Sequence, residues 1–285
     1  MGWLVTAGGP GRSATLWVGV VLYENTPREL ERLCAALQLN REMPGAPLFR
    51  TVWWDNSPSD GLRAELARLA PEDDYHFQGE NLGFGAAHNR LMREAFAAPS
   101  TRSYVCLNPD GIPHPRCLAE LEAEAARPGK TGLVEARLFP DEHPKPYGPV
   151  THETPWCSGC MLLVTRPLYQ EVGGFDERFF MYCEDVDLSW RARAAGFSIR
   201  VAPRALIHHY TVDRPLTPGR ERSVRRSAAL LGAKYGDAAF TRDRVAEYVA
   251  LGGEPFAWPT VARPEAPLAR ISDFRHLYTF AESRW

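Results

Sequence analysis

The stretch TLWVGVVLYENTPRE, residues 15–29, sets a pattern that the rest of the chain repeats. Its first part, Thr15 to Tyr23, is a near-continuous apolar run, which is typical of a strand buried on both faces in a parallel sheet. Thr26 and Glu29 then have the spacing of a capping box, and Pro27 stands at the first helical position. A buried strand followed at once by a helix is therefore expected.

The same alternation continues over the first half of the chain. Apolar runs predict further strands at Phe49–Trp54, Tyr75–Gln78 and Tyr104–Leu107. Helical periodicity predicts helices at Leu62–Ala70 and Ala86–Ala97 between them. Strand and helix in alternation favour a doubly wound α/β domain with a mostly parallel sheet, in which ligands gather at the carboxyl ends of the strands.

The second half of the chain has a less regular pattern. The spacing of its apolar residues predicts a helix at 114–127, strands at 131–139, 160–165, 198–202 and 205–210, and a helix at 220–235. A Pro-rich loop, 140–155, has a length that indicates either function or disorder. From Leu251 onward no periodicity is clear, so an irregular extension packed on the domain is expected.

The composition argues against several classes of protein. The chain has 285 residues, of which 45% are hydrophobic and 24% charged, so it can bury a sizeable core. A formal net charge of -2 argues against a nucleic-acid-binding protein. No apolar run approaches the ~18 residues that span a bilayer. The first residues lack the basic-then-apolar order of a secretory signal, and residues 1–14 are expected to be a flexible leader.

The six cysteines are best explained as reduced thiols of a cytoplasmic protein, because no secretory signal accompanies them. Cys157 and Cys160 form a CxxC pair, but no second pair stands at the spacing of a zinc ribbon. Ordinary buried thiols are therefore favoured over a metal or redox role for this pair.

Residues 173–197, GGFDERFFMYCEDVDLSWRARAAGF, concentrate acidic side chains at the start of a predicted helix. Glu184, Asp185 and Asp187 would occupy its first turn, where acids complement the helix dipole by about 0.3–1 kcal/mol each. That explanation suffices for one or two of them, and Asp187 is the most plainly structural. The run from Phe179 to Tyr182 would wall a carboxylate with apolar groups and tune it as a base, so catalysis is favoured for the others.

Polar side chains also follow the predicted strands of the first half. They are Tyr23, Asp55, Asn81 and Asp110, each at or just beyond a strand end. Asx residues in such places often only make turns or caps, and for Asp55 the structural and functional interpretations are equally open. Asp110 is the stronger candidate, because prolines on both sides stiffen the backbone that presents it.

Taken together and in order, these motifs resemble the family 2 glycosyltransferases of the GT-A fold, in particular the bacterial rhamnosyltransferase-like branch. The matching stretches are VVLYENTPREL (20–30), VWWDNSPSDG (52–61), ENLGFGAAHN (80–89), LNPDG (107–111), SGCMLLVTR (158–166) and residues 173–197. The resemblance implies an inverting transfer of a sugar from a nucleotide-diphosphate sugar. It also implies a nucleotide-sugar-binding half, 15–113, an acceptor-binding and catalytic half, 114–214, and a C-terminal helical extension, 215–285.

The resemblance assigns roles to individual residues. On the nucleotide-sugar side it implies Asp55 as the acid that reads the nucleobase, with Tyr23, Asn81, Gly83 and Asn108 also lining the donor. Its DXD-like motif is Asn108-Pro109-Asp110, in which Asp110 would bind Mn²⁺ or Mg²⁺ and Asn108 replaces an acid.

On the acceptor side the resemblance implies Asp185 as the catalytic base, with Glu184 and Trp156 contacting the acceptor. The family's metal-binding histidine would be His209, although His208 is one position away and would face oppositely along a strand. The bulkier residues 210–213 depart from the small segment usual after that histidine.

The resemblance also implies partners and a location. The donor would be a dTDP- or UDP-sugar, such as dTDP-rhamnose, and the acceptor a glycan or lipid-linked glycan of a bacterial surface polysaccharide. A cytoplasmic protein, peripherally associated with the inner face of the cytoplasmic membrane, is expected. Arg222, Arg225 and Arg226 could contact a diphosphate or an anionic lipid-linked acceptor, and a solvated basic face is the equal alternative.

Two other functions remain open at this point. A sugar-nucleotide pyrophosphorylase also has an α/β nucleotide domain, but Tyr23-Glu24-Asn25 stands where its Gly-rich phosphate loop is expected. A non-catalytic nucleotide-sugar-binding partner of another transferase is the third possibility. The presence of Asp110, Asp185 and a histidine argues against it.

Overall fold

The first strand and helix form where the sequence predicts them. Strand β1 (Leu16–Leu22) is almost wholly buried, and helix α1 (Pro27–Glu42) begins directly after Thr26. The Thr26 hydroxyl accepts a hydrogen bond from the Glu29 backbone N–H, and the Glu29 carboxylate accepts one from the Thr26 N–H at 2.7 Å. This reciprocal capping satisfies two backbone donors that the start of the helix would otherwise leave unpaired.

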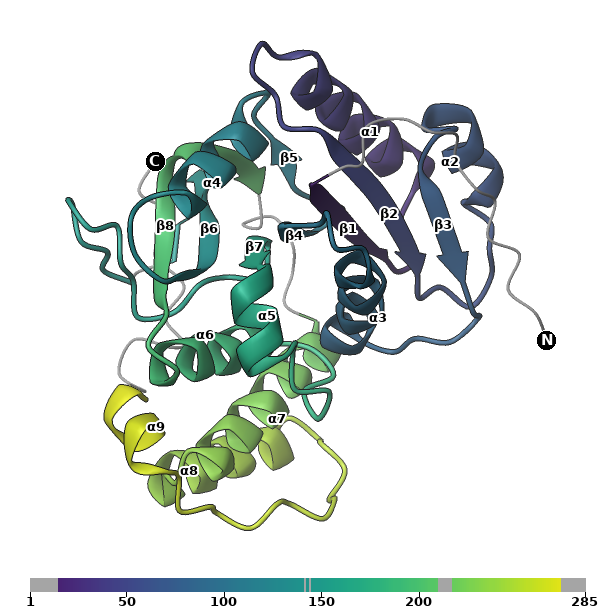
Figure 1. Ribbon diagram of the computed structural model, residues 1–285. Coiled ribbons are helices and arrows are strands. Elements are labelled where there is room, and N and C mark those ends of the chain that lie inside the picture. Colours follow the sequence, from purple (N-terminus) through teal and green to yellow (C-terminus); the bar gives the residue numbers. More distant parts are fainter. Residues whose placement is uncertain (1–14, 141, 144, 210–216, 273–285) are drawn as a thin grey trace.

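The computed structural model describes residues 15–140, 142–143, 145–209 and 217–272. In this part of the chain eight strands form one sheet in the order β3-β2-β1-β4-β7-β6-β8-β5 (Figure 1). Besides β1 they are β2 (Phe49–Asp55), β3 (Asp74–Phe77), β4 (Ser103–Leu107), β5 (Ile112–Pro113), β6 (Thr131–Pro140), β7 (Met161–Thr165) and β8 (Ser198–His209). Strands β1 to β4 pair in parallel, as do β6 and β8, whereas β7 and β5 run antiparallel to their neighbours. This mixed, mostly parallel sheet confirms the predicted α/β class.

Helices cover both faces of the sheet and enclose two separate apolar cores. On one face α1, α2 and α4 bury residues such as Leu33, Leu66 and Leu121 against the strands. On the other, α3, α5 and α6 bury residues such as Leu91 and Leu188. The bounds of these helices are α2 (Arg63–Leu69), α3 (Phe84–Ala97), α4 (Cys117–Ala125), α5 (Arg166–Val172) and α6 (Glu184–Ala194). Burial on both faces explains why the central strands are apolar throughout instead of alternating.

Three C-terminal helices add a third apolar cluster beside α6. They are α7 (Pro218–Lys234), α8 (Ala238–Ala250) and α9 (Ala266–Ile271), and Figure 1 shows them together at one end of the molecule, below α6. Trp190 of α6 is fully buried, and its ring meets that of Tyr235 edge to face with the centroids 4.7 Å apart. The extension therefore packs on the sheet domain at α6.

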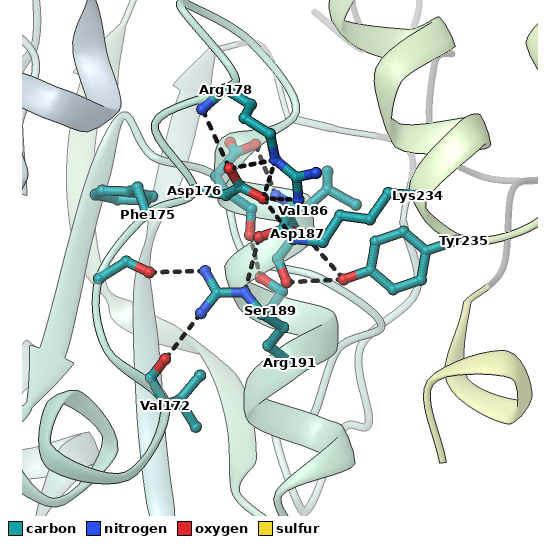
Figure 2. A network of polar contacts seen from close by, with 12 residues as sticks. Val172, Phe175, Asp176, Arg178, Val186, Asp187, Ser189, Arg191, Lys234 and Tyr235 are labelled. Atoms are coloured by element: carbon teal, nitrogen blue, oxygen red, sulfur yellow. Dashed lines mark hydrogen bonds and ion pairs between the residues drawn. The ribbon is translucent and has the colours of Figure 1, made fainter. Parts of the chain in front are cut away.

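A buried polar network fastens the end of α7 to the first turn of α6. The carboxylate of Asp187 is fully buried. It accepts hydrogen bonds from the Tyr235 hydroxyl at 3.0 Å and from the Arg191 guanidinium at 2.8 Å (Figure 2). It also forms an ion pair with the Lys234 ammonium. Lys234 also pairs with Asp176 at 2.8 Å. Asp187 thus holds elements together, which agrees with its interpretation as a structural acid.

Several details differ from the sequence-based expectation. The strand pieces expected at 198–202 and 205–210 are the single strand β8, because β8 stays paired with β6 across a register shift that follows Ala136. Pro203 and Arg204 interrupt the apolar pattern at this point, which made one strand look like two. Helices α5 and α8 were not predicted, and α9 lies within the part expected to be irregular.

Two expectations fall on residues that the structure does not describe. They are the flexible leader, residues 1–14, and the bulky segment, residues 210–213. Among the helices that are described, none combines the length and the apolar character needed to span a bilayer.

Removal of the Asp187 carboxylate is expected to destabilise the protein strongly. Asp187→Ala leaves Lys234 and Arg191 without their buried partner, and breaking a buried ion pair in this way costs about 3–5 kcal/mol. The free energy of unfolding, measured by urea denaturation, should fall by that amount. Asp60→Ala is the matched control, because it removes an exposed ion pair with Arg63 and should cost about 1 kcal/mol or less. Equal losses in the two variants would contradict the structural role of Asp187.

Candidate functional site

Asp110 and His209 meet at the carboxyl ends of β4 and β8. The Nε2 atom of His209 lies 3.3 Å from a carboxylate oxygen of Asp110, and each side chain is 15% exposed. His208 is exposed and lies beside the ring of Phe139, because successive side chains of a strand point to opposite faces. Of the two histidines that the sequence left open, the structure thus brings His209 to Asp110.

The turn that carries Asp110 is held between two strands. The Asn108 N–H donates to the carbonyl oxygen of Cys160 at 2.8 Å, and the Gly111 N–H donates to the carbonyl oxygen of Asn108 at 3.1 Å. A Cβ atom on Gly111 would lie 2.5 Å from the side chain of Ile207 in β8. Glycine therefore allows the turn to approach β8 closely enough for Asp110 to reach His209.

The helix that carries Glu184 and Asp185 begins after a strained turn. Tyr182 and Cys183 have positive φ angles of 71° and 68°, a conformation that non-glycine residues rarely adopt and that clusters at functional sites. Helix α6 starts directly afterwards. One oxygen of Asp185 then accepts a hydrogen bond from the Gly159 N–H at 2.8 Å.

Two hydrogen bonds attach the turn of Asp110 and the start of α6 to the consecutive residues Gly159 and Cys160. Gly159 donates to Asp185, and Cys160 accepts from the backbone of Asn108, two residues before Asp110. Because Gly159 and Cys160 are consecutive, the turn with Asp110 and the start of α6 are both anchored at the beginning of β7. The structure thus gathers Asp110, His209 and Asp185, which come from three distant parts of the sequence.

Burial and hydrogen bonding give Glu184 and Asp185 different properties. Removal from water raises the pKa of both carboxyl groups, and the charge of Asp185 raises the pKa of Glu184 further. Hydrogen bonds from the N–H groups of Gly159 and Val186, the latter at 2.8 Å, oppose the rise in the pKa of Asp185. In the described structure one oxygen of Glu184 has no hydrogen-bond partner. A single proton shared by the pair is therefore better placed on Glu184, which leaves Asp185 as the carboxylate.

The Pro-rich loop contributes buried groups that the sequence did not reveal. The Lys145 ammonium is only 4% exposed; it forms an ion pair with Glu135 of β6 and donates to the carbonyl oxygen of Trp156 at 2.8 Å. It also lies 3.9 Å from the centre of the Trp156 ring. Glu135 in turn accepts a hydrogen bond from the Ser158 N–H at 2.9 Å. These contacts attach the loop at Lys145 to β6 and to the segment before Gly159.

Trp156 is less accessible than an acceptor-contacting residue was expected to be. Its side chain lies under the loop, in a residue only 5% exposed, with the ring of His143 at 5.0 Å from its own. Burial, together with the positive charges of Lys145 and His209, lowers the pKa of His143 to about 3. His143 is therefore neutral at physiological pH, and the role predicted for Trp156 in acceptor binding stays a prediction.

On the nucleotide side, Asp55 is fully buried and already has two donors. The Ser57 N–H donates to one carboxylate oxygen at 2.8 Å, and the Tyr75 hydroxyl donates to the other at 2.6 Å. Burial and the neighbouring Asp55 carboxylate raise the pKa of Tyr75. The turn-forming interpretation of Asp55 is thus realised, and each of its oxygens retains a lone pair for a further donor. Tyr23, by contrast, is half-exposed at the end of β1.

The Gly83 segment is shaped by two asparagines. Asn81 accepts a hydrogen bond from the Gly83 N–H at 2.9 Å, and the Asn56 amide donates to the Gly83 carbonyl oxygen at 3.1 Å. Gly83 has a φ of 80°, and a Cβ atom there would lie 2.2 Å from the carbonyl oxygen of Phe180. Asn56 was not singled out from the sequence, although it adjoins Asp55 in the same turn, because its partner is distant along the chain.

The residues present fit the binding of a divalent cation. Asp110 and His209 supply a carboxylate and an imidazole, ligand types that Mn²⁺ accepts. Within the described ranges no group of three His, Cys, Asp or Glu side chains could hold a metal ion by itself. The remaining ligands would therefore be phosphate oxygens and water, as is usual for cations that accompany a diphosphate.

The CxxC pair has the properties of ordinary core thiols. Both Cys157 and Cys160 are buried, and burial raises the pKa of the Cys157 thiol. A thiol with a raised pKa is a poor nucleophile and a poor metal ligand at neutral pH. The structure thus agrees with the buried-thiol interpretation of the motif.

Glu184→Gln is expected to make protein stability less sensitive to alkaline pH. Because burial raises the folded-state pKa of Glu184 above its unfolded value, its contribution to stability is fully present below the unfolded pKa and is lost as pH rises through the folded pKa. Glutamine does not titrate, so the free energy of unfolding of the variant relative to the wild type should increase from pH 4 to pH 8. Urea denaturation at several pH values measures it, with Glu72→Gln at an exposed position as control. A difference that stays constant with pH would refute the assignment.

Comparison with known proteins places this geometry in context. No family model matches the chain. Two curated relatives, both from Mycobacterium tuberculosis and both named N-acetylglucosaminyl-diphospho-decaprenol L-rhamnosyltransferase, are 30% identical to it over 235 residues, a match that covers 67% of this chain and 75% of each relative. At this identity and coverage, the chain belongs to the same family as these relatives.

Solved structures with the same arrangement are glycosyltransferases. A mannosyltransferase from Pyrobaculum calidifontis, in complex with GDP-Man and Mn²⁺, has a TM-score of 0.59 at 16% identity and covers 95% of this chain and 71% of its own. GalNAc-T7, with UDP, GalNAc and Mn²⁺, has a TM-score of 0.62 at 12% identity and covers 90% of this chain and 53% of its own. At such low identity the likeness concerns the fold alone, which is GT-A.

Proposed function

Because this chain belongs to the family 2 glycosyltransferases of the GT-A fold, we propose that it is a metal-dependent inverting enzyme. It moves a sugar from a nucleotide-diphosphate sugar to a hydroxyl of a glycan or glycolipid acceptor. The observation that carries the proposal is the convergence of Asp110 and His209 with Asp185 around the start of β7. Asp110 and His209 together suit the charged leaving group, and Asp185 suits the attacking hydroxyl.

In the proposed reaction Asp185 acts as the base. The acceptor hydroxyl gives its proton to Asp185 while its oxygen forms the new bond to the anomeric carbon, and the bond from that carbon to the donor phosphate breaks on the opposite side. The nucleoside diphosphate leaves with the bonding electron pair. When bound by Asp110 and His209, a divalent cation supplies charge neutralisation for this leaving group.

The identity of donor and acceptor is proposed from the relatives. The name of the Mycobacterium tuberculosis relatives specifies rhamnose as the sugar and a diphospho-decaprenol as the acceptor. We extend this to rhamnose from dTDP-rhamnose, or a UDP-sugar in its place, and to a lipid-linked glycan in surface polysaccharide synthesis. Tyr23, Asp55, Asn81, Gly83 and Asn108 would bind the donor. An enzyme of this kind would work in the cytoplasm at the inner face of the membrane.

The two competing functions from the sequence lose their support. The sugar-nucleotide pyrophosphorylase drew on the α/β nucleotide domain, and the non-catalytic partner on a protein that keeps the fold and lacks turnover. The relatives are named transferases, and the match covers three quarters of their length, 75%.

Asp185→Asn is expected to abolish sugar transfer. The amide oxygen can still accept from Gly159, but the group no longer takes a proton, and loss of a general base lowers the rate by about 10²–10⁴-fold. Transfer is measured with radiolabelled donor. Affinity for the nucleoside diphosphate in the presence of Mn²⁺ should remain near the wild-type value, which shows that the variant is folded. Full turnover by this variant would remove Asp185 from the mechanism.

Binding of the nucleoside diphosphate is expected to depend on the cation through His209. With Mn²⁺, dTDP or UDP should raise the melting temperature, since a ligand specific for the folded state stabilises it by mass action. EDTA should cancel that shift and stop transfer, and Mn²⁺ or Mg²⁺ in excess should restore both. His209→Ala should lose most of the Mn²⁺-dependent shift, whereas His208→Ala, at the exposed neighbouring position, should keep it. Unchanged activity in chelator would overturn the metal assignment.

A further inference from the structure

Three arginines of α7 were candidates for binding an anion: Arg222, Arg225 and Arg226. They have different partners in the structure. Arg222 donates to the carbonyl oxygen of Leu251 at 3.2 Å, and Arg225 forms an ion pair with Glu247 at 2.6 Å. Arg226 has neither kind of contact within the described chain, and its guanidinium lies 4.5 Å from the centre of the Phe256 ring. Arg222 and Arg225 therefore tie the C-terminal helices together, whereas Arg226 is the one of these three without a carbonyl or carboxylate partner within the described chain.

Arg226 lines a pocket of about 340 Å³ between α7 and the aromatic run that precedes α6. The pocket is lined by Phe180, Met181, Ser223, Arg226 and Ser227. The Ser227 hydroxyl donates to the Met181 carbonyl oxygen at 2.6 Å, which fixes the two walls to each other. One cation, two hydroxyl groups and two large apolar side chains are thus combined in one cavity.

The pocket lies next to the site of the proposed base. Met181 is followed by the strained turn at Tyr182 and Cys183, after which α6 begins with Glu184 and Asp185. On its other side Phe180 accepts a hydrogen bond from the Phe84 N–H at 2.9 Å. The pocket is therefore lined by residues that directly precede the turn into the helix of Asp185.

We propose that this pocket binds the phosphate group and adjoining hydrocarbon of a lipid-phosphate-linked acceptor. The Arg226 guanidinium would hold the phosphate by charge-assisted hydrogen bonds, for which its planar fork is well suited. Phe180, with a side chain that is half-exposed, and Met181 would contact the hydrocarbon. The proposal rests on the proposed transferase function and specifies the class of its acceptor.

Binding of farnesyl phosphate below its micellar concentration tests the pocket directly. The dissociation constant is measured by calorimetry for the full chain, with inorganic phosphate and farnesol as the two partial probes. Wild-type protein should bind farnesyl phosphate more tightly than either partial probe. Arg226→Gln should weaken binding about 10-fold or more, and Arg226→Lys should retain part of the affinity. Arg242→Gln, an equal charge change at an exposed position on α8, should have no effect.

A second variant separates a lipid phosphate from a free phosphate. Phe180→Ser should weaken farnesyl phosphate binding and leave inorganic phosphate binding unchanged. If inorganic phosphate binds as tightly as farnesyl phosphate, the cavity is a site for free anions and the lipid proposal is wrong. Equal farnesyl phosphate affinity in wild type and Arg226→Gln, with both melting at the same temperature, would also overturn it.

Transfer assays distinguish failure of this proposal from failure of the proposed function. Arg226→Gln should lower kcat/KM for a lipid-phosphate-linked acceptor about 10-fold and leave kcat/KM for a neutral alkyl glycoside acceptor unchanged. An equal loss for both acceptors would contradict a role in holding phosphate. Absence of transfer by the wild type to any acceptor, with binding of farnesyl phosphate intact, would contradict the transferase and not the pocket.

Discussion

The site depends on the backbone of Gly159 and Cys160, two consecutive residues directly before β7. The N–H group of Gly159 holds Asp185, and the carbonyl oxygen of Cys160 holds the turn of Asp110. Strand β7 lies between β4 and β6 and is antiparallel to both. The parallel first half of the sheet therefore ends at β7. A backbone anchor of this kind fixes two acids from distant segments without relying on flexible side chains. The candidate site thus lies where the strand direction changes within the GT-A fold.

The first turn of α6 contains acids in opposite electrostatic situations. Asp187 has Tyr235, Arg191 and Lys234 as partners, so its burial is compensated. Glu184 has an oxygen without a partner in the described structure, and burial raises its pKa. A paired buried charge fixes the position of a helix, whereas a buried polar atom without a partner costs stability. The network at Asp187 therefore supports the helix start that presents Glu184 and Asp185.

The sequence predicted features that depend on local pattern or on a well-marked motif. Buried strands, the capping box at Thr26 and the ordered glycosyltransferase motifs led to the α/β class and to the family, and both were confirmed. It missed Lys145, because a lone lysine in a Pro-rich loop carries no signal until folding brings it to Glu135 of β6. It missed Asn56 for the same reason, since the Gly83 carbonyl that it binds is far along the chain. Roles of single residues within the site stay predictions, because they depend on where substrates bind.

Helix α7 links the stability of the extension to the acceptor side of the site. Its C-terminal end supplies Lys234 to Asp187, and its middle supplies Ser227 to the carbonyl oxygen of Met181. Both contacts reach the segment on either side of the strained turn at Tyr182 and Cys183. Positive φ angles in non-glycine residues cost about 1–3 kcal/mol each and persist only when surrounding contacts enforce them. The contacts that α7 makes on both sides of this turn therefore help to maintain the backbone conformation that places Asp185 beside Gly159.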